Sequence, residues 1–344
     1  MALELTHGYS STDMMDVRLP YPGLMGLGEL GARCTREQLN PPSMPVPDAL
    51  ARVRDLVRDD IGAGEVHHEI PALAKVDPRF FGIAFAGVDG SVVGVGDWTR
   101  QFSIQSISKL FSLALLLSLD GDEVWQHVGR HPSAAPYNEL PEIGGPVPRN
   151  PFINAGALVV VGRLLELMDD PRRSLLDLLR VESGNPSLRV DENVVESERA
   201  HGGRNAVIAD LIATSGRLSR PSGQLLEQYL HQCAIAMSCA ELAKAGLFLA
   251  RGGVLSDGRA LLSGSTTKRL NATLLTCGAY GASSDMAYSV GLPLKTGIGG
   301  GILGVLPGIG TVCAWSPSLD AHGNSIAAAK AMSLFTTLTG WSVF

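Results

Sequence analysis

The chain has 344 residues, of which 45% are hydrophobic and 18% charged, so it can bury a large core and form one large domain or two. Its formal net charge of -6 excludes a broad basic surface for nucleic acid. The N-terminus has no basic region followed by an apolar run, and the most apolar run, LFSLALLLSL, is far shorter than the ~20 residues that span a bilayer, so we expect a cytoplasmic protein without a membrane or nucleic-acid partner.

The first third of the chain contains an arm, a helix and a hairpin. Residues 1–45 are rich in Gly and Pro and predict an irregular arm outside the main fold. A helix is predicted to begin near Pro47, in DALARVRDLVRDD. Two apolar runs joined by Asp89-Gly90 predict a β-hairpin. The segment LFSLALLLSL that follows QFSIQSISK is apolar on every side and predicts a buried helix.

The middle of the chain has helical periodicity, in AGALVVVGRLLELMDD, SLLDLLRVES, GQLLEQYLHQCAIAM and SCAELAKAGLFLARGG. The last of these opens with Ser238 and Glu241, a capping box. Near the C-terminus, GGGILGVLPGIGTVCAW predicts two strands about Pro307-Gly308, and a final helix is opened by Asn324 or Ser325.

Strands near both ends with helices between them predict an α+β fold. We expect an antiparallel sheet from about residues 46–105 and 290–344, with terminal helices packed on it. Residues 106–289 are expected to form a central helical subdomain.

Metal ligands are not indicated. The five cysteines form no C-x-x-C pair, and their odd number is typical of free thiols. His67 and His68 are adjacent, and no H-E-x-x-H motif is present. We expect neither a metal nor a cofactor.

The stretch QSISK contains an S-x-x-K pattern, Ser106 and Lys109, at the start of the predicted buried helix. Residues three apart share a helix face, and a buried lysine amine can take a serine proton. The alternative is an N-cap serine and a surface lysine. A second match, Ser265 and Lys268, opens a more polar segment and is interpreted as a decoy.

A second stretch supports the catalytic interpretation. Lys295-Thr296-Gly297 comes just before a predicted strand, and a K-T-G triad downstream of S-x-x-K recurs in serine β-lactamases and penicillin-binding proteins. By itself, K-T-G also fits a Gly-rich hairpin entry. The S-x-N-like stretch Ser183 to Asn185 precedes Pro186 and is interpreted as a turn.

Several further stretches occur in a specific order: FSIQSISK, NPFINAGAL, ESE followed by RNAVIA, EQYLHQCAI, TCGAYGASSDMAYSVGLPLKTGIGGGI, and GNS before the last helix. In this order they resemble the β-lactamase-like serine glutaminases, which hydrolyse L-glutamine to L-glutamate and ammonia. The similarity runs from about residue 50 to Phe344. It implies a serine β-lactamase-like fold, L-glutamine as the substrate, and a homodimer or homotetramer.

The resemblance also implies roles for individual residues. Ser106 matches the nucleophile and Lys109 its partner, and either Lys109 or a tyrosine takes the serine proton. The other matching residues correspond to substrate-binding positions: Gln105, Asn154, Glu198, Asn205, Tyr229, Tyr280 and, through its backbone, Ile298. Tyr229 and Tyr280 are also expected to be catalytic.

Each assignment has a structural alternative. Glu198 could be a solvated charge in the acidic stretch DENVVESE, Asn154 and Asn205 could be caps, Tyr229 could be core and Tyr280 a loop aromatic. At the level of function, the alternatives are a β-lactamase or peptidoglycan peptidase, and a non-catalytic glutamine-binding protein on the same fold.

Overall fold

The computed structural model describes residues 43–134, 136–140, 147–216 and 218–344. Nearly all of the predicted arm, residues 1–45, lies outside this part of the chain, as does Cys34.

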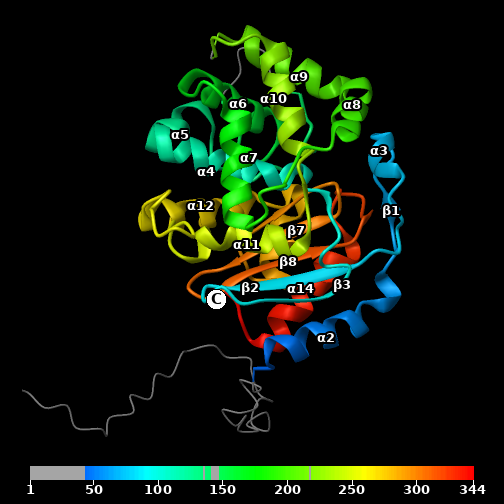
Figure 1. The fold of residues 1–344 in the computed structure, drawn as a ribbon. Helices are drawn as coiled ribbons and strands as arrows, with labels where there is room; N and C mark the ends of the chain where they lie inside the picture. The colour runs from blue at the N-terminus through cyan, green and yellow to red at the C-terminus, as the bar shows by residue number, and fades with distance from the viewer. Residues whose placement is uncertain (1–42, 135, 141–146, 217) are drawn as a thin grey trace, which may run out of the picture. The chain divides into compact units, whose positions relative to one another are not determined.

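A five-stranded antiparallel sheet is built from two distant parts of the chain, as the sequence predicts (Figure 1). The strand order is β3-β2-β8-β7-β6, with β3 and β6 at the edges. The Asp89-Gly90 and Pro307-Gly308 hairpins are both confirmed. The strands are β2 Gly82–Gly87, β3 Val92–Gly96, β6 Leu294–Thr296, β7 Gly301–Leu306 and β8 Gly310–Trp315.

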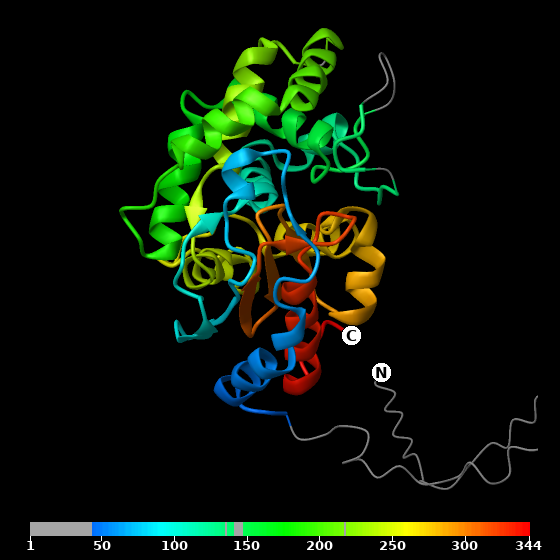
Figure 2. The ribbon, with the colours of Figure 1, turned by 90° about the vertical axis from the view of Figure 1, so that its right-hand side faces the viewer.

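The two terminal helices cover one face of the sheet. Helix α2, Val46–Leu56, packs beside α14, Ile326–Thr339, as the blue and red helices of Figure 2. Ser325 caps α14 by accepting the Ala328 N–H, which selects between the two predicted cap residues. Phe335 is fully buried in the core between these helices and the sheet.

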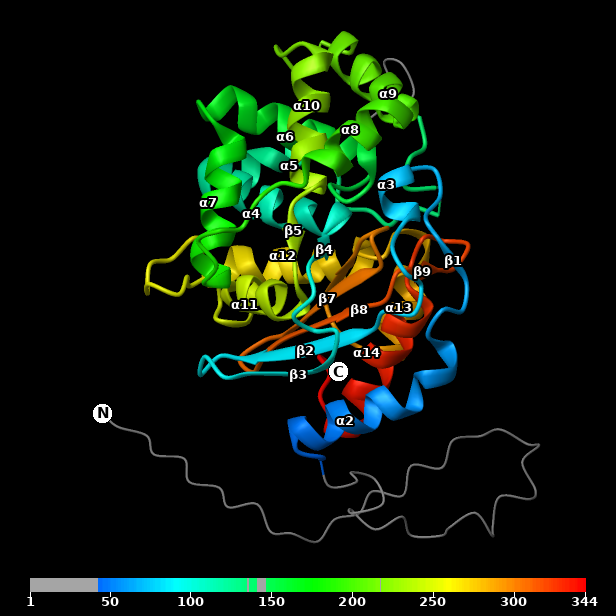
Figure 3. The ribbon, with the colours of Figure 1, turned by 45° about the vertical axis from the view of Figure 1, so that its right-hand side comes forward.

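The opposite face is covered by α11, Cys239–Ala250, which packs on β2 and β8 (Figure 3). Its predicted capping box is present: Ser238 accepts the Glu241 N–H, and Glu241 accepts the Ser238 N–H. The sequence analysis placed this helix in the helical subdomain. The prediction failed here because a helix that is apolar on most sides can pack on a sheet as well as on other helices. Helix α12, Gly264–Cys277, lies beside the edge strand β6, and α13 spans Ser283–Ser289.

The remaining helices pack together above the sheet (Figures 1 and 3). Helix α4 is almost entirely buried, as its uniform hydrophobicity predicts. The helices of this part are α4 Ser108–Asp120, α5 Val124–His127, α6 Asn154–Leu167, α7 Pro171–Ser183, α8 Glu192–His201, α9 Gly203–Thr214 and α10 Ser222–Cys233.

Short elements connect the two parts of the fold and were not predicted. Strand β4, Phe102–Ser103, pairs with β5, Ala236–Met237, and so joins the chain before Ser106 to the chain after α10. Strand β1 pairs with β9. The other short elements are β1 Glu65–Val66, β9 Ser318–Leu319, α3 Pro71–Ala74, and the 3-10 turns η1 Arg58–Asp60, η2 Gln105–Ile107, η3 Gly121–Glu123 and η4 Tyr280–Ala282.

Among the described residues, every helix is too short or too polar to cross a membrane.

Candidate active site

Ser106 lies in η2, the 3-10 turn that leads directly into α4, and is only 4% exposed. The preceding residue, Gln105, has a φ of 48°, which is uncommon for a non-glycine residue and costs about 1–3 kcal/mol. Its side-chain amide donates to Ser103 Oγ at 2.9 Å and to Glu198 Oε1 at 2.7 Å. These contacts hold the strained turn that presents Ser106.

Lys109 is buried one helical turn further on, with 1% of its surface exposed. Its Nζ donates to the Phe152 carbonyl at 3.1 Å and to Asn154 Oδ1 at 2.6 Å. Both acceptors are uncharged. Burial lowers the pKa of Lys109 to about 8, against the weaker upward influence of Cys233 and Glu198. The alternative of a surface lysine is therefore wrong.

Asn154 begins α6 and connects three of the predicted residues. Its Oδ1 accepts from Lys109 and from the Tyr229 hydroxyl at 3.0 Å, and its Nδ2 donates to Asn205 Oδ1 at 2.7 Å. The resemblance assigned Asn154 to the substrate, and these contacts give it a second task, which is to hold Lys109. Helix α10 brings Tyr229 into the same network.

Glu198 is 3% exposed and forms no salt bridge within the described part of the chain. Burial raises its pKa to about 7, although the Gln105 hydrogen bond and the Lys109 charge act in the opposite direction. The alternative of a solvated charge is thus wrong. A buried carboxylate with one amide donor is a suitable partner for an incoming cation.

Tyr280 begins η4 with a φ of 56°. Its hydroxyl is buried and makes no hydrogen bond within the described residues. Burial raises its pKa, and the nearby Ser106 side chain acts in the opposite direction. The ring packs 4.9 Å from the Tyr137 ring, so Tyr280 is a buried residue at the site and not a loop aromatic.

Lys295, from the K-T-G stretch, lies beneath Tyr280 with its Nζ 4.2 Å from the ring centroid. It is fully buried at the start of edge strand β6 and donates to the carbonyls of Gly278 and Thr296, at 2.9 and 2.8 Å. Burial, with help from the Lys109 charge, lowers the pKa of Lys295 well below its usual range. The K-T-G stretch is therefore more than a hairpin entry.

A single pocket gathers seven of the nine predicted site residues: Gln105, Ser106, Asn154, Glu198, Asn205, Tyr229 and Ile298. Lys109 and Tyr280 lie behind its wall. Sequence reasoning missed Tyr137, Arg204, His67 and Glu69, which also line this pocket. Arg204 begins the stretch RNAVIA, in which only Asn205 was given a role. The other three belong to no motif, so their only signal is closeness in the fold.

Two backbone N–H groups at this pocket are unused. Within the described residues, neither the Ser106 N–H nor the Ile298 N–H donates a hydrogen bond. Strand β6 and turn η2 lie against each other because residue 297 is glycine: a Cβ there would lie 2.6 Å from the Ile104 carbonyl oxygen and 3.3 Å from the Ser106 nitrogen. The two N–H groups are the kind of pair that stabilises an oxyanion.

The two decoys are outside the site. Ser265 and Lys268 are exposed on the first turns of α12. Ser183 ends α7, and Gly184 follows as its left-handed C-cap, so the S-x-N-like stretch is a turn as predicted. Within the described residues, no cluster of three or more His, Cys, Asp and Glu side chains could hold a metal ion.

The glutaminase family model matches residues 64–344. A glutaminase from Streptomyces coelicolor is 52% identical over 297 residues, which cover 86% of this chain and 97% of the relative.

The chain belongs to the glutaminase family. It is accordingly an enzyme, an amidohydrolase, and the resemblance found in its motifs is confirmed.

Solved glutaminase structures share the fold. The probable glutaminase ybaS superposes with a TM-score of 0.79 at 30% identity, over 86% of this chain and 98% of that one. The glutamate form of Mglu gives a TM-score of 0.79 at 32% identity, over 86% of this chain and 68% of that one. The expected α+β, serine β-lactamase-like fold is confirmed.

Gly297→Ala tests the close approach of β6 to η2. The added Cβ cannot be accommodated without moving Ile298 away from Ser106, and overpacking of this kind costs about 1–3 kcal/mol. We expect ammonia release from glutamine to fall at least about tenfold. Gly223→Ala is the matched control, because nothing lies within 4 Å of a Cβ there. Normal activity in Gly297→Ala would show that the two N–H groups do not act together.

Proposed function

We propose that this enzyme hydrolyses L-glutamine through an acyl-enzyme on Ser106. The observation that carries the proposal is that Ser106 lines the pocket together with two backbone N–H groups that have no partner among the described residues, and that Lys109, one helical turn further on, is buried with a lowered pKa. Ser106 Oγ attacks the side-chain amide carbon, and the Ser106 and Ile298 N–H groups hold the resulting oxyanion. The C–N bond breaks, ammonia leaves with the transferred proton, and water then hydrolyses the γ-glutamyl ester.

The amino acid end of glutamine would be bound by the polar wall opposite Ser106. Glu198 pairs with the ammonium group, whose charge also restores the carboxylate to its ionised form. Asn205 Nδ2 and the second N–H of Asn154 Nδ2 offer donors for the carboxylate, and Tyr229, whose single O–H donates to Asn154 Oδ1, holds Asn154 in place. Gln105 supports this wall, since its amide bonds Glu198 directly.

Lys109 is the better candidate for the base. Burial raises the pKa of Tyr229 and of Tyr280, so a tyrosinate is costly at either position. Burial moves the pKa of Lys109 in the useful direction, to about 8. Tyr280, whose hydroxyl lies near the Ser106 side chain, stays neutral and can serve as a hydrogen-bond partner of the serine.

The competing functions have less support. A β-lactamase or peptidase does not need the buried carboxylate of Glu198, which has no cationic partner among the described residues and suits the ammonium of a free amino acid. A glutamine sensor does not need a lysine with a lowered pKa beside a serine. The cytoplasmic location and the homodimeric or homotetrameric state stay predictions.

Ser106→Ala should abolish ammonia release and leave glutamine binding measurable by calorimetry, because only the nucleophilic oxygen is lost. Ser265→Ala, in the exposed second S-x-x-K match, is the control and should keep the wild-type rate. Activity within tenfold of wild type in Ser106→Ala would rule out the acyl-enzyme.

Glu198→Gln should lower kcat/KM for glutamine roughly 100-fold or more, since breaking one side of a buried charge pair costs roughly 3–5 kcal/mol. N-acetylglutamine, which lacks the ammonium group, should be a poor substrate of the wild type. Glu196→Gln, exposed on the same helix, is the matched control. Equal turnover of glutamine and N-acetylglutamine by the wild type would remove Glu198 from this role.

Lys109→Arg should be inactive although it keeps a positive charge, because arginine cannot lose its proton in a protein. In the wild type, kcat/KM should rise with pH as Glu198 ionises near 7 and as Lys109 loses its proton near 8. Lys268→Arg, at an exposed lysine, is the control. A near-normal rate in Lys109→Arg would show that Lys109 is not the base, and the Ser106 proton would then have to go to Tyr229 or Tyr280.

A further inference from the structure

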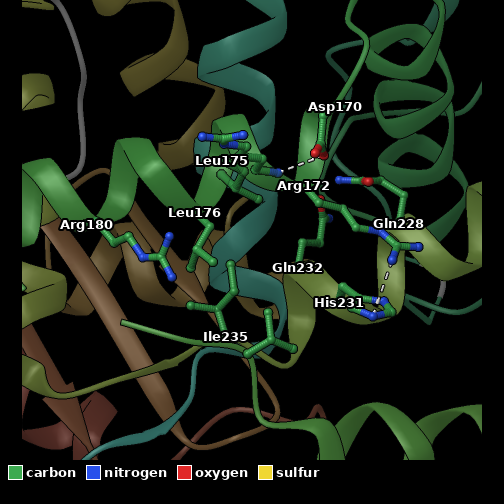
Figure 4. Close-up of a pocket in the computed structure, with 11 residues that line it drawn as sticks. Asp170, Arg172, Leu175, Leu176, Arg180, Gln228, His231, Gln232 and Ile235 are labelled. Carbon is green, nitrogen blue, oxygen red and sulfur yellow. Dashed lines mark hydrogen bonds between the residues drawn. The ribbon is translucent and has the colours of Figure 1, made fainter. Parts of the chain in front are cut away.

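A second cavity lies between α7 and α10 (Figure 4). Its volume is about 250 Å³, and it shares no lining residue with the pocket around Ser106. Pockets that hold drug-sized ligands measure roughly 300–1,000 Å³, so an occupant here would be smaller.

The floor of the cavity is apolar. Leu175 from α7 and Ile235 after α10 are both buried and face it, with Leu176 beside them (Figure 4). Apolar walls of this kind take an aliphatic or aromatic body and exclude a strongly hydrated one.

Two buried glutamines on α10 line the same cavity and have unused polar groups. Gln228 is 3% exposed, and its side-chain amide has no hydrogen-bond partner within the described residues. Gln232 is also buried; its Oε1 accepts from Ser112 Oγ at 2.6 Å, but its Nε2 donates to no group in the described part of the chain. An unpaired, buried N–H group such as Gln232 Nε2 is destabilising, and an acceptor on a ligand would relieve this.

Arg172 adds a cation whose own contacts are long. Its Nη1 lies 3.4 Å from His231 Nε2, and its Nη2 lies 3.9 Å from Glu227. Both oxygens of Glu227 are already taken by Arg199, at 2.8 and 2.9 Å. The guanidinium therefore has donors to spare for a carboxylate, with which it pairs in a bidentate way.

The other charged side chains that line the cavity, Asp170, Arg173 and Arg180, have partners of their own. Arg173 Nε lies 3.4 Å from Asp177 Oδ2. Asp170 caps α7 by accepting the Arg173 N–H. Arg180 donates to the Leu188 carbonyl and to Asp177.

We propose that this cavity binds a small monocarboxylic acid with a short aliphatic or aromatic body. The carboxylate accepts from Arg172 and from the Gln228 amide, and the body lies against Leu175 and Ile235. The ligand would then contact α10, the helix that carries Tyr229, and would lie next to the Gln232–Ser112 link to α4.

Calorimetric titration of the full chain with benzoate tests this proposal without relying on turnover, so its outcome is independent of the proposed mechanism. We expect one saturable site in the wild type and at least tenfold weaker binding in Arg172→Met, which corresponds to about 1.4 kcal/mol. Ile235→Trp, which fills the floor, should also lose binding. Arg52→Met, at an exposed arginine of α2, is the control, and thermal unfolding checks that each variant is folded.

Three further arms make the result specific. Benzyl alcohol, which has the same ring without the charge, should bind much more weakly than benzoate. L-Glutamate, added in excess, should leave benzoate binding unchanged. The proposal is overturned if benzoate shows no saturable binding, if benzyl alcohol binds equally well, if Arg172→Met binds normally, or if L-glutamate displaces benzoate.

Discussion

The active site depends on burying lysine side chains against neutral oxygens. Lys109 is held by the Phe152 carbonyl and the Asn154 side chain, and Lys295 by the Gly278 and Thr296 carbonyls. A carboxylate hydrogen-bonded to either lysine would stabilise its protonated form and raise its pKa. Neutral acceptors orient the amine without adding this charge, so burial lowers the pKa. Within the described residues neither lysine forms a salt bridge, and burial lowers the pKa of Lys109 to about 8, as its proposed role as the base requires.

The other features of the site come from segments that are distant in the sequence and adjacent in the fold. Edge strand β6 comes from the C-terminal part of the sheet and lies against η2, which brings the Ser106 and Ile298 N–H groups to one side of the pocket. The hydrogen bond from Gln105 to Glu198 spans 93 residues and helps to maintain the strained φ of Gln105. Strain at Gln105, beside the proposed nucleophile, is thus offset by a contact that also positions Glu198.

Local chemistry could be predicted from the sequence, and long-range contacts could not. Turn residues located both hairpins, the Ser238–Glu241 box located the start of α11, and the uniform hydrophobicity of α4 predicted its burial. Motif order then selected Ser106 over Ser265. Nothing local distinguishes Glu198 from a solvated acid, because its burial depends on the packing of α8 against other helices. The same holds for the contact of Lys295 with Tyr280 and for the presence of Tyr137 at the site.

The most direct measurement is the pKa of Lys109 itself, followed by NMR through the ε-carbon of labelled lysine and assigned with Lys109→Met. The account predicts a transition near 8, well below the value of about 10.4 for a free lysine side chain. Exposed lysines such as Lys268 give the reference transition in the same spectra. A Lys109 resonance that stays fully protonated to about pH 10 would contradict the account, because the buried amine could then not serve as the base.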